Sequence, residues 1–523
     1  MSLSMHASRA WVSEFCPQLN LIDNEWRSSG DQEFIEIIDP SNEQVVAAVP
    51  LSTAAQVNDA LLSVSRTQKP WAEVSSWKRS EYLRAIANIM RRDVASYALV
   101  MTLEQGKPIE QAKGEILAAA DQFDWNADEA RRIYGRIVSA KNENDQIHIY
   151  RQPIGPVASF AAWNFPSLLP ARKISAALAA GCTVIAVPAF ESPLSCLLIG
   201  KAAIEAGLPA GVLNMVTGDA AMISQIIMDS DVVRKVSLTG SVPVGAITLA
   251  RAANSIKPVT VELGGHSAVI VLKDANVDEA AKLCAAGKYR NAGQVCISAS
   301  RFFVHESISE RFIAKFLEHA RTIKVGIGSD PGVDMGPLGS KKRISAMHEM
   351  IADAKSKGAE VALGGSASEE FSKGYFFQPT VLTNVKSDMV VMTEETFGPT
   401  IAINRVKSMA EAIALSNASR YGLGSSIWSK RQGKKIARQL HCGMVAINST
   451  ISFAAIASVP FGGVKDSGSG RIHGPEGILE FTYPRTVVRA RFQLPLAITS
   501  FKRSYFSDKL IVRAIKILKG RLS

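Results

Sequence analysis

The sequence predicts an α/β protein with two domains, each built around a largely parallel sheet. Strand-length apolar runs alternate with segments of helical periodicity from about residue 50 to about residue 460. Such alternation is typical of parallel sheets whose strands are joined by helices. With 523 residues and 47% hydrophobic content, the chain can bury two large cores. Aromatic residues are present and low-complexity tracts are not, which excludes a disordered protein.

The predicted elements fall into two series. The first series comprises a helical pattern at 78–104, a strand at 157–161, a helix at 170–180, a strand at 184–187, a helix at 194–206 and a strand at 212–216. The second comprises a strand in R-F-F-V-H (301–305), a helix at 308–322 and a strand at 443–448. The uncharged stretch 174–190 is expected to be a helix end, a turn and a buried strand, because polar residues, glycine and proline interrupt it.

Two segments outside these series alternate apolar and polar residues. They are Q-I-H-I-Y-R-Q at 146–152 and Y-P-R-T-V-V-R-A-R at 483–491. The pattern fits an edge ribbon that joins subunits, and it fits a surface hairpin equally well.

The cysteines and the charge indicate the protein's surroundings. Six cysteines lie at 16, 182, 196, 284, 296 and 442, and their spacing fits neither a zinc site nor a disulfide framework, so no metal is expected. Scattered thiols and an N-terminus without a signal-peptide core favour a cytoplasmic protein. From Arg489 onward, nine basic residues against one acid contribute +8 of the net charge of +11. The basicity therefore belongs to a tail and does not predict nucleic-acid binding.

Three residues are candidates for chemistry, each with a plainer alternative. Cys296 ends the polar stretch R-N-A-G-Q-V-C and is either packing material or a nucleophile. Glu262 lies in a strand-like apolar run before two glycines, where a carboxylate is either salt-bridged or a general base. Asn164, in A-A-W-N-F-P, either forms a turn or donates to an oxyanion.

A fourth candidate is the turn in K-V-S-L-T-G-S-V-P-V-G (235–245), where Gly240 and Ser241 follow a strand and Gly245 comes four residues later. Such a turn aims free N–H groups at a pyrophosphate. The four candidates together suit one reaction class: a thiolate adds to a carbonyl, a hydride leaves to a nicotinamide, and a carboxylate activates water to cleave a thioester. A cysteine protease would need a histidine partner, and none of the eight histidines lies in a comparable motif.

These blocks occur in the order found in the aldehyde dehydrogenase superfamily. E-E-T-F-G-P (394–399), Y-G-L-G (421–424) and P-F-G-G-V-K-D-S-G (460–468) complete the set, and the sequence resembles that family from about residue 20 to about residue 490. In motif it is most similar to succinate-semialdehyde dehydrogenase-like members. The resemblance implies an enzyme that oxidises an aldehyde with NAD or NADP.

The resemblance also implies a role for each matching residue. It makes Cys296 the nucleophile, Glu262 the general base, and Asn164 with the Cys296 backbone N–H the oxyanion hole. The other implied assignments are Lys173 in the proton path, Trp163 at the cofactor cleft, Gly240, Ser241 and Gly245 at the pyrophosphate, and Glu395 with Phe397 at the nicotinamide ribose.

The fold implied by the resemblance is aldehyde dehydrogenase-like. It has a Rossmann-like cofactor domain, an α/β catalytic domain and a bridging β-ribbon, usually in homodimers or homotetramers. The expected boundaries are 20–130 and 153–264 for the cofactor domain, 265–464 for the catalytic domain, 131–152 and 465–491 for the ribbon, and 492–523 for a basic tail.

The sequence departs from the family pattern at the cofactor site. Val187 and Phe190 replace the lysine and glutamate that usually hold the adenine ribose, and neither can hydrogen-bond to a hydroxyl. NAD versus NADP is therefore open. The departure also raises a rival hypothesis, a cofactor-poor family member that acts as a binding protein. A third hypothesis is ester hydrolysis without nucleotide, which needs only Cys296 and Glu262.

Two arginines bear on the substrate. Arg172 and Arg290 match carboxylate-binding positions of succinate-semialdehyde dehydrogenases, and paired guanidiniums suit a dicarboxylic semialdehyde. The serine of those enzymes falls at Ala455 or Ile456 here, and Ser458 is the nearest substitute. The apolar loop around it favours an aromatic or aliphatic aldehyde instead.

The tail contains an amphipathic pattern at 506–520. Basic residues gather on one face and aliphatic residues on the other. The pattern fits a helix at a membrane surface, which would make the protein peripherally membrane-associated, and it equally fits docking on the protein itself or on a partner subunit.

Overall fold

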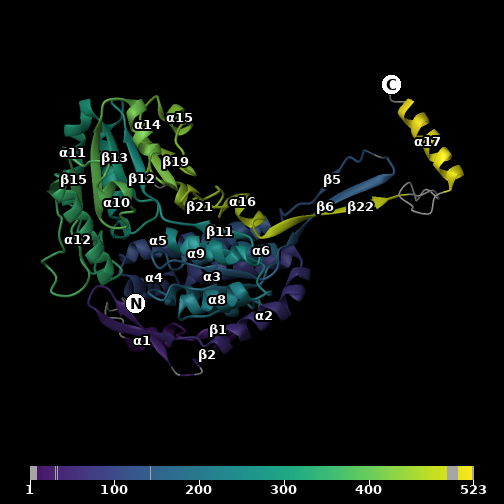
Figure 1. Ribbon diagram of the computed structural model, residues 1–523. Helices are drawn as coiled ribbons and strands as arrows, with labels where there is room; N and C mark the ends of the chain where they lie inside the picture. Colours follow the sequence, from purple (N-terminus) through teal and green to yellow (C-terminus); the bar gives the residue numbers. More distant parts are fainter. Residues whose placement is uncertain are drawn as a thin grey trace. The chain divides into compact units, whose positions relative to one another are not determined.

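The computed structural model describes residues 9–29, 31, 33–141, 143–450, 452–491 and 504–520. The chain forms two compact units. The first contains Met1–Ile133 and Pro153–Tyr483, and the second contains Tyr134–Gln152 and Pro484–Ser523. Two large sheets with their helices make up most of the first unit (Figure 1).

The first sheet has eight strands in the spatial order β2-β1-β9-β8-β7-β10-β11-β21. The strands are β1 (Asn20–Ile22), β2 (Glu25–Arg27), β7 (Val157–Phe160), β8 (Val184–Val187), β9 (Leu213–Met215), β10 (Lys235–Thr239), β11 (Val259–Glu262) and β21 (Gly468–Ser469). β7 to β11 are parallel, and their spatial order reverses between β7 and β10. This confirms the predicted Rossmann-like arrangement, in which ligands bind outside the carboxyl ends of the strands at the reversal.

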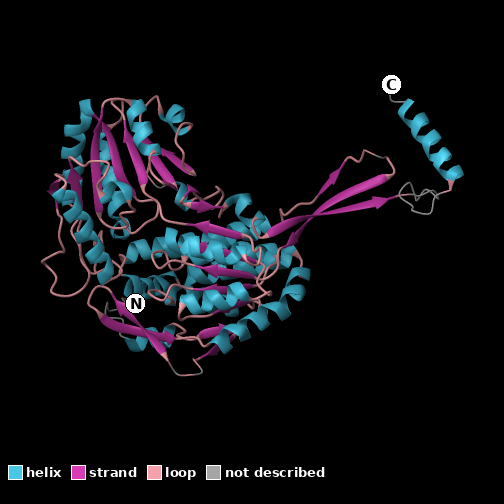
Figure 2. Ribbon diagram, in the orientation of Figure 1, coloured by secondary structure: helices cyan, strands magenta, loops and turns pink. Residues whose placement is uncertain are grey.

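Helices cover both faces of this sheet (Figure 2). One face packs on α3 (Ser76–Arg92), α4 (Val94–Gln105), α5 (Ile109–Ala130), α6 (Leu168–Ala180) and α7 (Leu194–Glu205), and the other on α2 (Ala54–Glu73), α8 (Ala220–Asp229) and α9 (Val242–Ala253). α6 is buried along its whole length, so Arg172 and Lys173 enter the interior on an otherwise apolar helix. The single helix expected at 78–104 is two helices, because Asp93 leaves the helical conformation between α3 and α4.

The second sheet has seven strands in the spatial order β14-β15-β16-β13-β12-β18-β19. They are β12 (Ser267–Val271), β13 (Ala299–His305), β14 (Glu360–Leu363), β15 (Thr380–Thr383), β16 (Thr400–Val406), β18 (Gly424–Trp428) and β19 (Met444–Ile447). All neighbours are parallel except β14 and β15. Its helices are α10 (Val277–Tyr289), α11 (Glu306–Arg321), α12 (Lys341–Ser356), α13 (Val390–Thr393), α14 (Met409–Asn417) and α15 (Gly433–Ala437).

The second unit contains a three-stranded sheet of β5 (Arg136–Val138), β6 (Asp145–Pro153) and β22 (Thr482–Ala490). The expected ribbon boundary at 465 differs from the structure. β21 pairs with β11 of the first sheet, and α16 (Gly474–Leu479) packs on α5 and α6. A Cβ at Gly468 would overlap the backbone of β11, so this glycine lets the segment enter the sheet of the first unit.

The remaining elements are α1 (Arg9–Phe15), the pair β3 (Phe34–Asp39) and β4 (Gln44–Pro50), the pair β17 (Tyr421–Gly422) and β20 (Val464–Lys465), and α17 (Tyr505–Gly520). Among the described residues, no helix has the length and apolar character needed to cross a bilayer. The described part of the tail is α17, whereas 492–503 and 521–523 lie outside the described residues.

Candidate active site

One cavity of about 1010 Å³ opens at the carboxyl ends of the first sheet's parallel strands. Ligand pockets commonly reach ~1,000 Å³, so this cavity has room for a dinucleotide together with a small substrate. Eleven of the predicted site residues line it: Trp163, Asn164, Arg172, Val187, Phe190, Gly240, Ser241, Arg290, Cys296, Glu395 and Phe397. Segments more than two hundred residues apart in the sequence therefore meet around one space.

The loop that carries Cys296 has a strained backbone. Asn291, Ala292 and Gly293 all have positive φ, at 49°, 52° and 71°. A non-glycine residue in this conformation costs about 1–3 kcal/mol and persists only where its surroundings hold it. A Cβ at Gly293 would overlap the backbone of the E-E-T-F-G-P segment, which explains the glycine of N-A-G-Q.

The two glycines of E-L-G-G make room for two other parts of the site. A Cβ at Gly264 would overlap the carboxylate of Glu395, and a Cβ at Gly265 would overlap the carbonyl oxygen of Cys296. The motif therefore lets the end of β11 approach both segments closely, and it leaves Glu262 beside the thiol.

A chain of hydrogen bonds runs from Cys296 into the interior. The Cys296 thiol donates to Oε1 of Glu262 at 3.3 Å. Oε2 of Glu262 accepts from the Thr239 hydroxyl at 3.0 Å, and that hydroxyl accepts from Nζ of Lys173 at 2.5 Å. Lys173 and Glu262 are both buried. This arrangement can take a proton from the thiol and pass it from the carboxylate towards the lysine.

Burial shapes the electrostatics of this chain. It raises the pKa of the Cys296 thiol well above its ordinary value, and the charge of Glu262 raises it further. Burial lowers the pKa of Lys173 to about 8. The thiol therefore rests in its neutral form, and its ionisation depends on a nearby base. Lys173 changes charge close to neutral pH and can accept a proton there.

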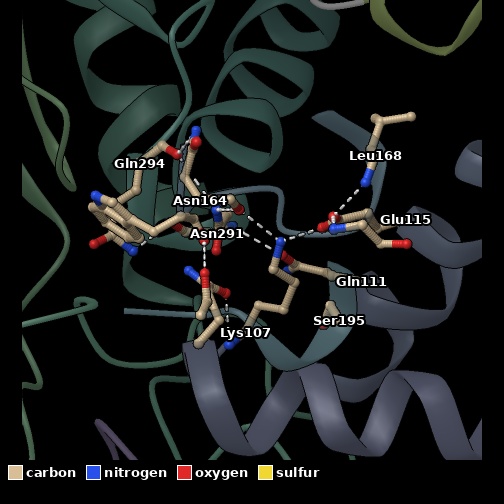
Figure 3. Close-up of polar contacts among 12 residues, drawn as sticks. Lys107, Gln111, Glu115, Asn164, Leu168, Ser195, Asn291 and Gln294 are labelled. Carbon is tan, nitrogen blue, oxygen red and sulfur yellow. Dashed lines mark hydrogen bonds and ion pairs between the residues drawn. The ribbon is translucent and has the colours of Figure 1, made fainter. Parts of the chain in front are cut away.

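Asn164 lies in the loop that follows β7, and a network of hydrogen bonds holds it in place (Figure 3). Its Nδ2 donates to the backbone oxygen of Gln294 at 3.0 Å. Its own backbone oxygen accepts from Nδ2 of Asn291 at 3.0 Å and from Nζ of Lys107 at 2.9 Å. An amide nitrogen carries two hydrogens, so Asn164 keeps one N–H for an oxygen bound in the cavity.

Lys107 and Glu115 form a fully buried ion pair beneath Asn164. The second carboxylate oxygen of Glu115 accepts from the backbone N–H groups of Ser167 and Leu168 at 3.0 and 3.1 Å, at the start of α6. Gln111, from the same helix α5, accepts from the Asn291 backbone at 2.8 Å. One helix thus holds both sides of the reactive site, the Asn164 segment and the strained cysteine loop (Figure 3).

The part of the cavity where the sequence predicts the nicotinamide is aromatic and polar. Trp163 and Phe397 meet edge to face at 5.6 Å between centroids. Glu395 accepts from the Gly265 backbone at 3.0 Å, and burial raises its pKa to about 7. Arg343 donates to the backbone oxygens of Thr396 and Phe397, each at 2.9 Å, which fixes this segment. These groups suit a nicotinamide ring and its ribose.

The phosphate and adenosine ends differ in character. α9 begins after Ser241 without a side-chain cap, so its first N–H groups remain for an anion. Gly245 is absent from the cavity wall. It packs closely against Leu263, and a Cβ at this position would overlap that side chain. Farther along, Val187, Val244 and Ile247 make the wall apolar, and Phe190 is 51% exposed. The site fits a dinucleotide, with packing rather than hydrogen bonds at its adenosine end.

Arg172 and Arg290 line the same cavity as Cys296. Arg172 donates to the Ala454 backbone oxygen at 3.2 Å and lies 4.6 Å from the Phe461 ring centroid. Among the described residues, neither arginine has an ion-pair partner, and Nε of the buried Arg172 has no hydrogen-bond partner. Burial lowers the pKa of Arg172. Both guanidiniums are available to a bound carboxylate.

Sequence reasoning misplaced one residue and missed several. Ser458 is exposed and is absent from the cavity wall, where Ser452, Ala454 and Ala455 lie instead. Thr239 lies in the quoted turn motif directly before Gly240, but nothing in the sequence shows that it links Glu262 to Lys173. Lys107 and Glu115 were also missed, since only their burial marks them. Arg343 was missed because only its hydrogen bonds to the Thr396 and Phe397 backbone mark it.

Comparisons with known proteins agree with this geometry. The sequence model described as the aldehyde dehydrogenase family matches residues 26–487. The chain is 38% identical over 471 residues to succinate-semialdehyde dehydrogenase [NADP(+)] of Escherichia coli, covering 89% of this chain and 97% of that one. It is 37% identical over 467 residues to glutarate-semialdehyde dehydrogenase of Pseudomonas aeruginosa, covering 88% and 96%. It also resembles betaine aldehyde dehydrogenase of Staphylococcus aureus in complex with NAD+, with a TM-score of 0.91, 30% identity and coverage of 95% and 99%.

We expect Lys107→Met to destabilise the fold and to slow the reaction. Removing one partner of a buried ion pair costs about 3–5 kcal/mol, and releasing the Asn164 backbone misplaces the reacting groups. The turnover number should fall roughly 10- to 100-fold while the KM for aldehyde changes less. Thermal unfolding and steady-state kinetics measure both effects.

Lys113→Met is the matched control for Lys107. Lys113 lies on α5, the helix that carries Glu115, and its ion pair with Glu110 is exposed to solvent, so its loss should cost less than about 1 kcal/mol. Glu115→Gln keeps the side-chain shape and should change turnover in the same direction as Lys107→Met. Equal, small effects in all three variants would contradict a positioning role for the pair.

We expect Glu262→Gln to have opposite effects on two reactions of Cys296. Loss of the carboxylate charge lowers the pKa of the thiol, so alkylation by iodoacetamide near neutral pH should accelerate, because more of the thiol is ionised. Aldehyde turnover should fall about 10²- to 10⁴-fold, because the general base is lost. Glu191→Gln, in the same cavity wall, should leave both rates near normal. Slower alkylation in Glu262→Gln would show that the carboxylate lowers the thiol pKa instead.

Proposed function

Because the chain belongs to the aldehyde dehydrogenase family and catalyses NAD(P)-dependent oxidation of an aldehyde, we propose that its substrate is a short aldehyde with a carboxylate at its far end. Succinic semialdehyde is the first candidate. The observation that carries this proposal is the pair of guanidiniums, Arg172 and Arg290, in the cavity that contains Cys296. Neither has a carboxylate partner among the described residues.

Charge balance supports a dicarboxylic substrate. A buried guanidinium without an anion is costly, and a bound carboxylate supplies both the charge and a bidentate geometry. The names of the Escherichia coli and Pseudomonas aeruginosa relatives refer to succinate and glutarate semialdehydes. Each of these aldehydes carries a carboxylate at the end opposite its carbonyl, which agrees with the two arginines.

The reaction that we propose begins at Cys296. Glu262 takes the thiol proton, the sulfur attacks the aldehyde carbon, and the new oxyanion lies against the Asn164 amide and the Cys296 backbone N–H. The dinucleotide, when bound, supplies the nicotinamide that accepts the hydride. Glu262 then activates a water that attacks the thioester carbon, and the carboxylic acid leaves as the thiol re-forms. Lys173 receives or returns the proton through Thr239.

We propose that the cofactor lies along the wall from Trp163 to Phe190. Glu395 and Phe397 hold its nicotinamide ribose, and Gly240 and Ser241 lie beneath its pyrophosphate, with Gly245 packing behind them. The related proteins are named with NADP(+) in one case and NAD+ in another. Val187 and Phe190 offer no hydrogen bond that selects between the two. The cofactor-poor alternative is not retained, because the chain belongs to a family of oxidoreductases.

An apolar aldehyde is the second candidate substrate. Phe165, Val295, Ile297 and Phe461 line the cavity beside Cys296. These walls suit an aromatic or aliphatic aldehyde, to which the two arginines would offer no favourable contact.

For assembly, we propose that the sheet of β5, β6 and β22 joins subunits in a dimer or tetramer, since Ile137 and Val488 expose large apolar side chains there.

The direct test measures reduced-nicotinamide formation with four aldehydes, each with NAD and with NADP. Succinic semialdehyde, glutaric semialdehyde, benzaldehyde and a long-chain aldehyde separate the carboxylate class from the apolar one. The proposal predicts that a semialdehyde has the highest kcat/KM. A higher value for benzaldehyde or the long-chain aldehyde would replace it with the second candidate.

We expect Arg172→Met and Arg290→Met each to lower kcat/KM for succinic semialdehyde roughly 10- to 150-fold. A hydrogen bond to a charged group contributes about 1.5–3 kcal/mol, and propanal, which has no carboxylate, should lose far less. Arg251→Met is the matched control, because Arg251 lines the same cavity from α9. An equal loss for propanal and the semialdehyde would mean that the arginines shape the site without binding a carboxylate.

We expect Val187→Lys to tighten binding of both dinucleotides, because the lysine restores a donor to the ribose. One hydrogen bond of about 1 kcal/mol corresponds to a Kd roughly fivefold lower. Phe190→Glu should favour NAD over NADP, since its carboxylate repels a 2′-phosphate. Calorimetric titration of each variant with both dinucleotides measures these shifts. Tighter NADP binding by Phe190→Glu would place the ribose elsewhere.

A further inference from the structure

The helix α17 has one apolar face and one basic face. At 100° per residue, the positions of Phe506, Leu510, Ile511, Ala514, Ile515 and Ile517 fall within one half of the helix circumference. Lys509, Arg513 and Lys516 fall in the other half. Ser507 alone interrupts the described part of the apolar half. A helix with this pattern needs something to cover its apolar side.

Most of that apolar face is exposed. Phe506 is 76%, Ile517 59% and Leu510 47% exposed, whereas Ile511 is 9% exposed. Exposed aromatic and aliphatic side chains clustered on one helix face mark an interaction surface. α17 therefore carries an exposed apolar surface that is available to a partner.

The charge of the segment identifies the kind of partner. In the sequence from Ser504 to Gly520, four basic residues face one acid, Asp508. Two copies of this helix packed through their apolar faces would leave most of the basic residues without an acidic partner, because each copy has only one acid against four basic residues. An anionic surface, in contrast, complements every basic residue while an apolar phase covers the other face.

The helix α17 also lies outside the part of the chain that matches the family. The family match ends at residue 487, and the Escherichia coli relative is covered over 97% of its length by 89% of this chain. The first large unit, which contains the active site, ends at Tyr483. The tail thus adds a property to an enzyme whose chemistry does not use it.

We propose that α17 binds the surface of anionic phospholipid membranes. The helix lies in the plane of the interface, with its apolar face among the acyl chains and Lys509, Arg513 and Lys516 at the phosphate groups. Apolar insertion and electrostatic attraction act together, which is the usual requirement for stable peripheral binding. This attachment would bring aldehyde oxidation to a membrane surface.

The test uses the full-length enzyme and vesicle co-sedimentation. Vesicles of phosphatidylcholine with about one-third phosphatidylglycerol should bind the enzyme, and vesicles of phosphatidylcholine alone should bind it at least about tenfold more weakly. Raising the salt to about 1 M should release most of it, because the Debye length falls to ~3 Å. Equal binding to both vesicles, or no binding to either, would overturn the proposal.

Two sets of substitutions separate the two faces. Phe506→Ser with Leu510→Ser and Ile517→Ser removes apolar insertion, and Lys509→Glu with Arg513→Glu and Lys516→Glu removes electrostatic attraction. Each set should weaken binding to the anionic vesicles at least about tenfold. Lys434→Glu with Lys435→Glu and Arg438→Glu makes the same charge change on exposed residues near α15 and should leave binding unchanged.

Aldehyde turnover and sedimentation velocity complete the comparison. Turnover should stay unchanged in every variant, which shows that each one folds. Unchanged vesicle binding in both face variants would contradict the proposal. Loss of an oligomer in the apolar-face variant, without any vesicle binding by the unmodified enzyme, would assign the face to a second copy of the chain instead.

Discussion

The buried ion pair of Lys107 and Glu115 is the interaction on which the reactive site depends. Two charges enclosed in an apolar interior are tolerated only when each is fully paired and hydrogen-bonded. Here the lysine also donates to the Asn164 backbone oxygen, and the glutamate also accepts from two N–H groups at the start of α6. Because α5 additionally holds Asn291 through Gln111, a single helix sets the distance between the amide that receives the oxyanion and the loop that carries the nucleophile.

The same burial that fixes the geometry also governs the nucleophile. A partly buried thiol beside a carboxylate has a raised pKa, so it rests as the unreactive neutral form. Reaction then requires that the neighbouring base accept the proton, and Glu262 has an onward route through Thr239 to Lys173. A lysine with a pKa near 8 can hold or release a proton at neutral pH. Protection of the thiol and its activation therefore arise from one set of contacts.

The chemical character of the cavity wall differs from one part to another. Arg172 and Arg290 line the cavity that contains Cys296, whereas Val187, Val244 and Ile247 make another part of the wall apolar. In the proposed function, a substrate carboxylate binds at the two arginines and the adenine base packs against the apolar part. The basic tail does not contribute to this cavity, because residues 484–523 belong to the second unit and the site belongs to the first. The chain thus combines the family's reaction with an amphipathic basic helix, α17, that follows the family match.

The sequence by itself determined the alternating elements and the reaction class, because periodicity, strand ends and motif residues such as Cys296, Glu262 and Asn164 are local signals. The strands at 184–187 and 443–448 needed no partner to be recognised. Only the tertiary structure decided that Thr239 joins Glu262 to Lys173 and that Lys107 and Glu115 support Asn164. It also decided that residues 465–481 belong to the first unit and that Ser458 is absent from the cavity wall. These features depend on contacts between segments from tens to more than two hundred residues apart. Such contacts leave no periodic trace along the chain, because burial and pairing are properties of the packed fold.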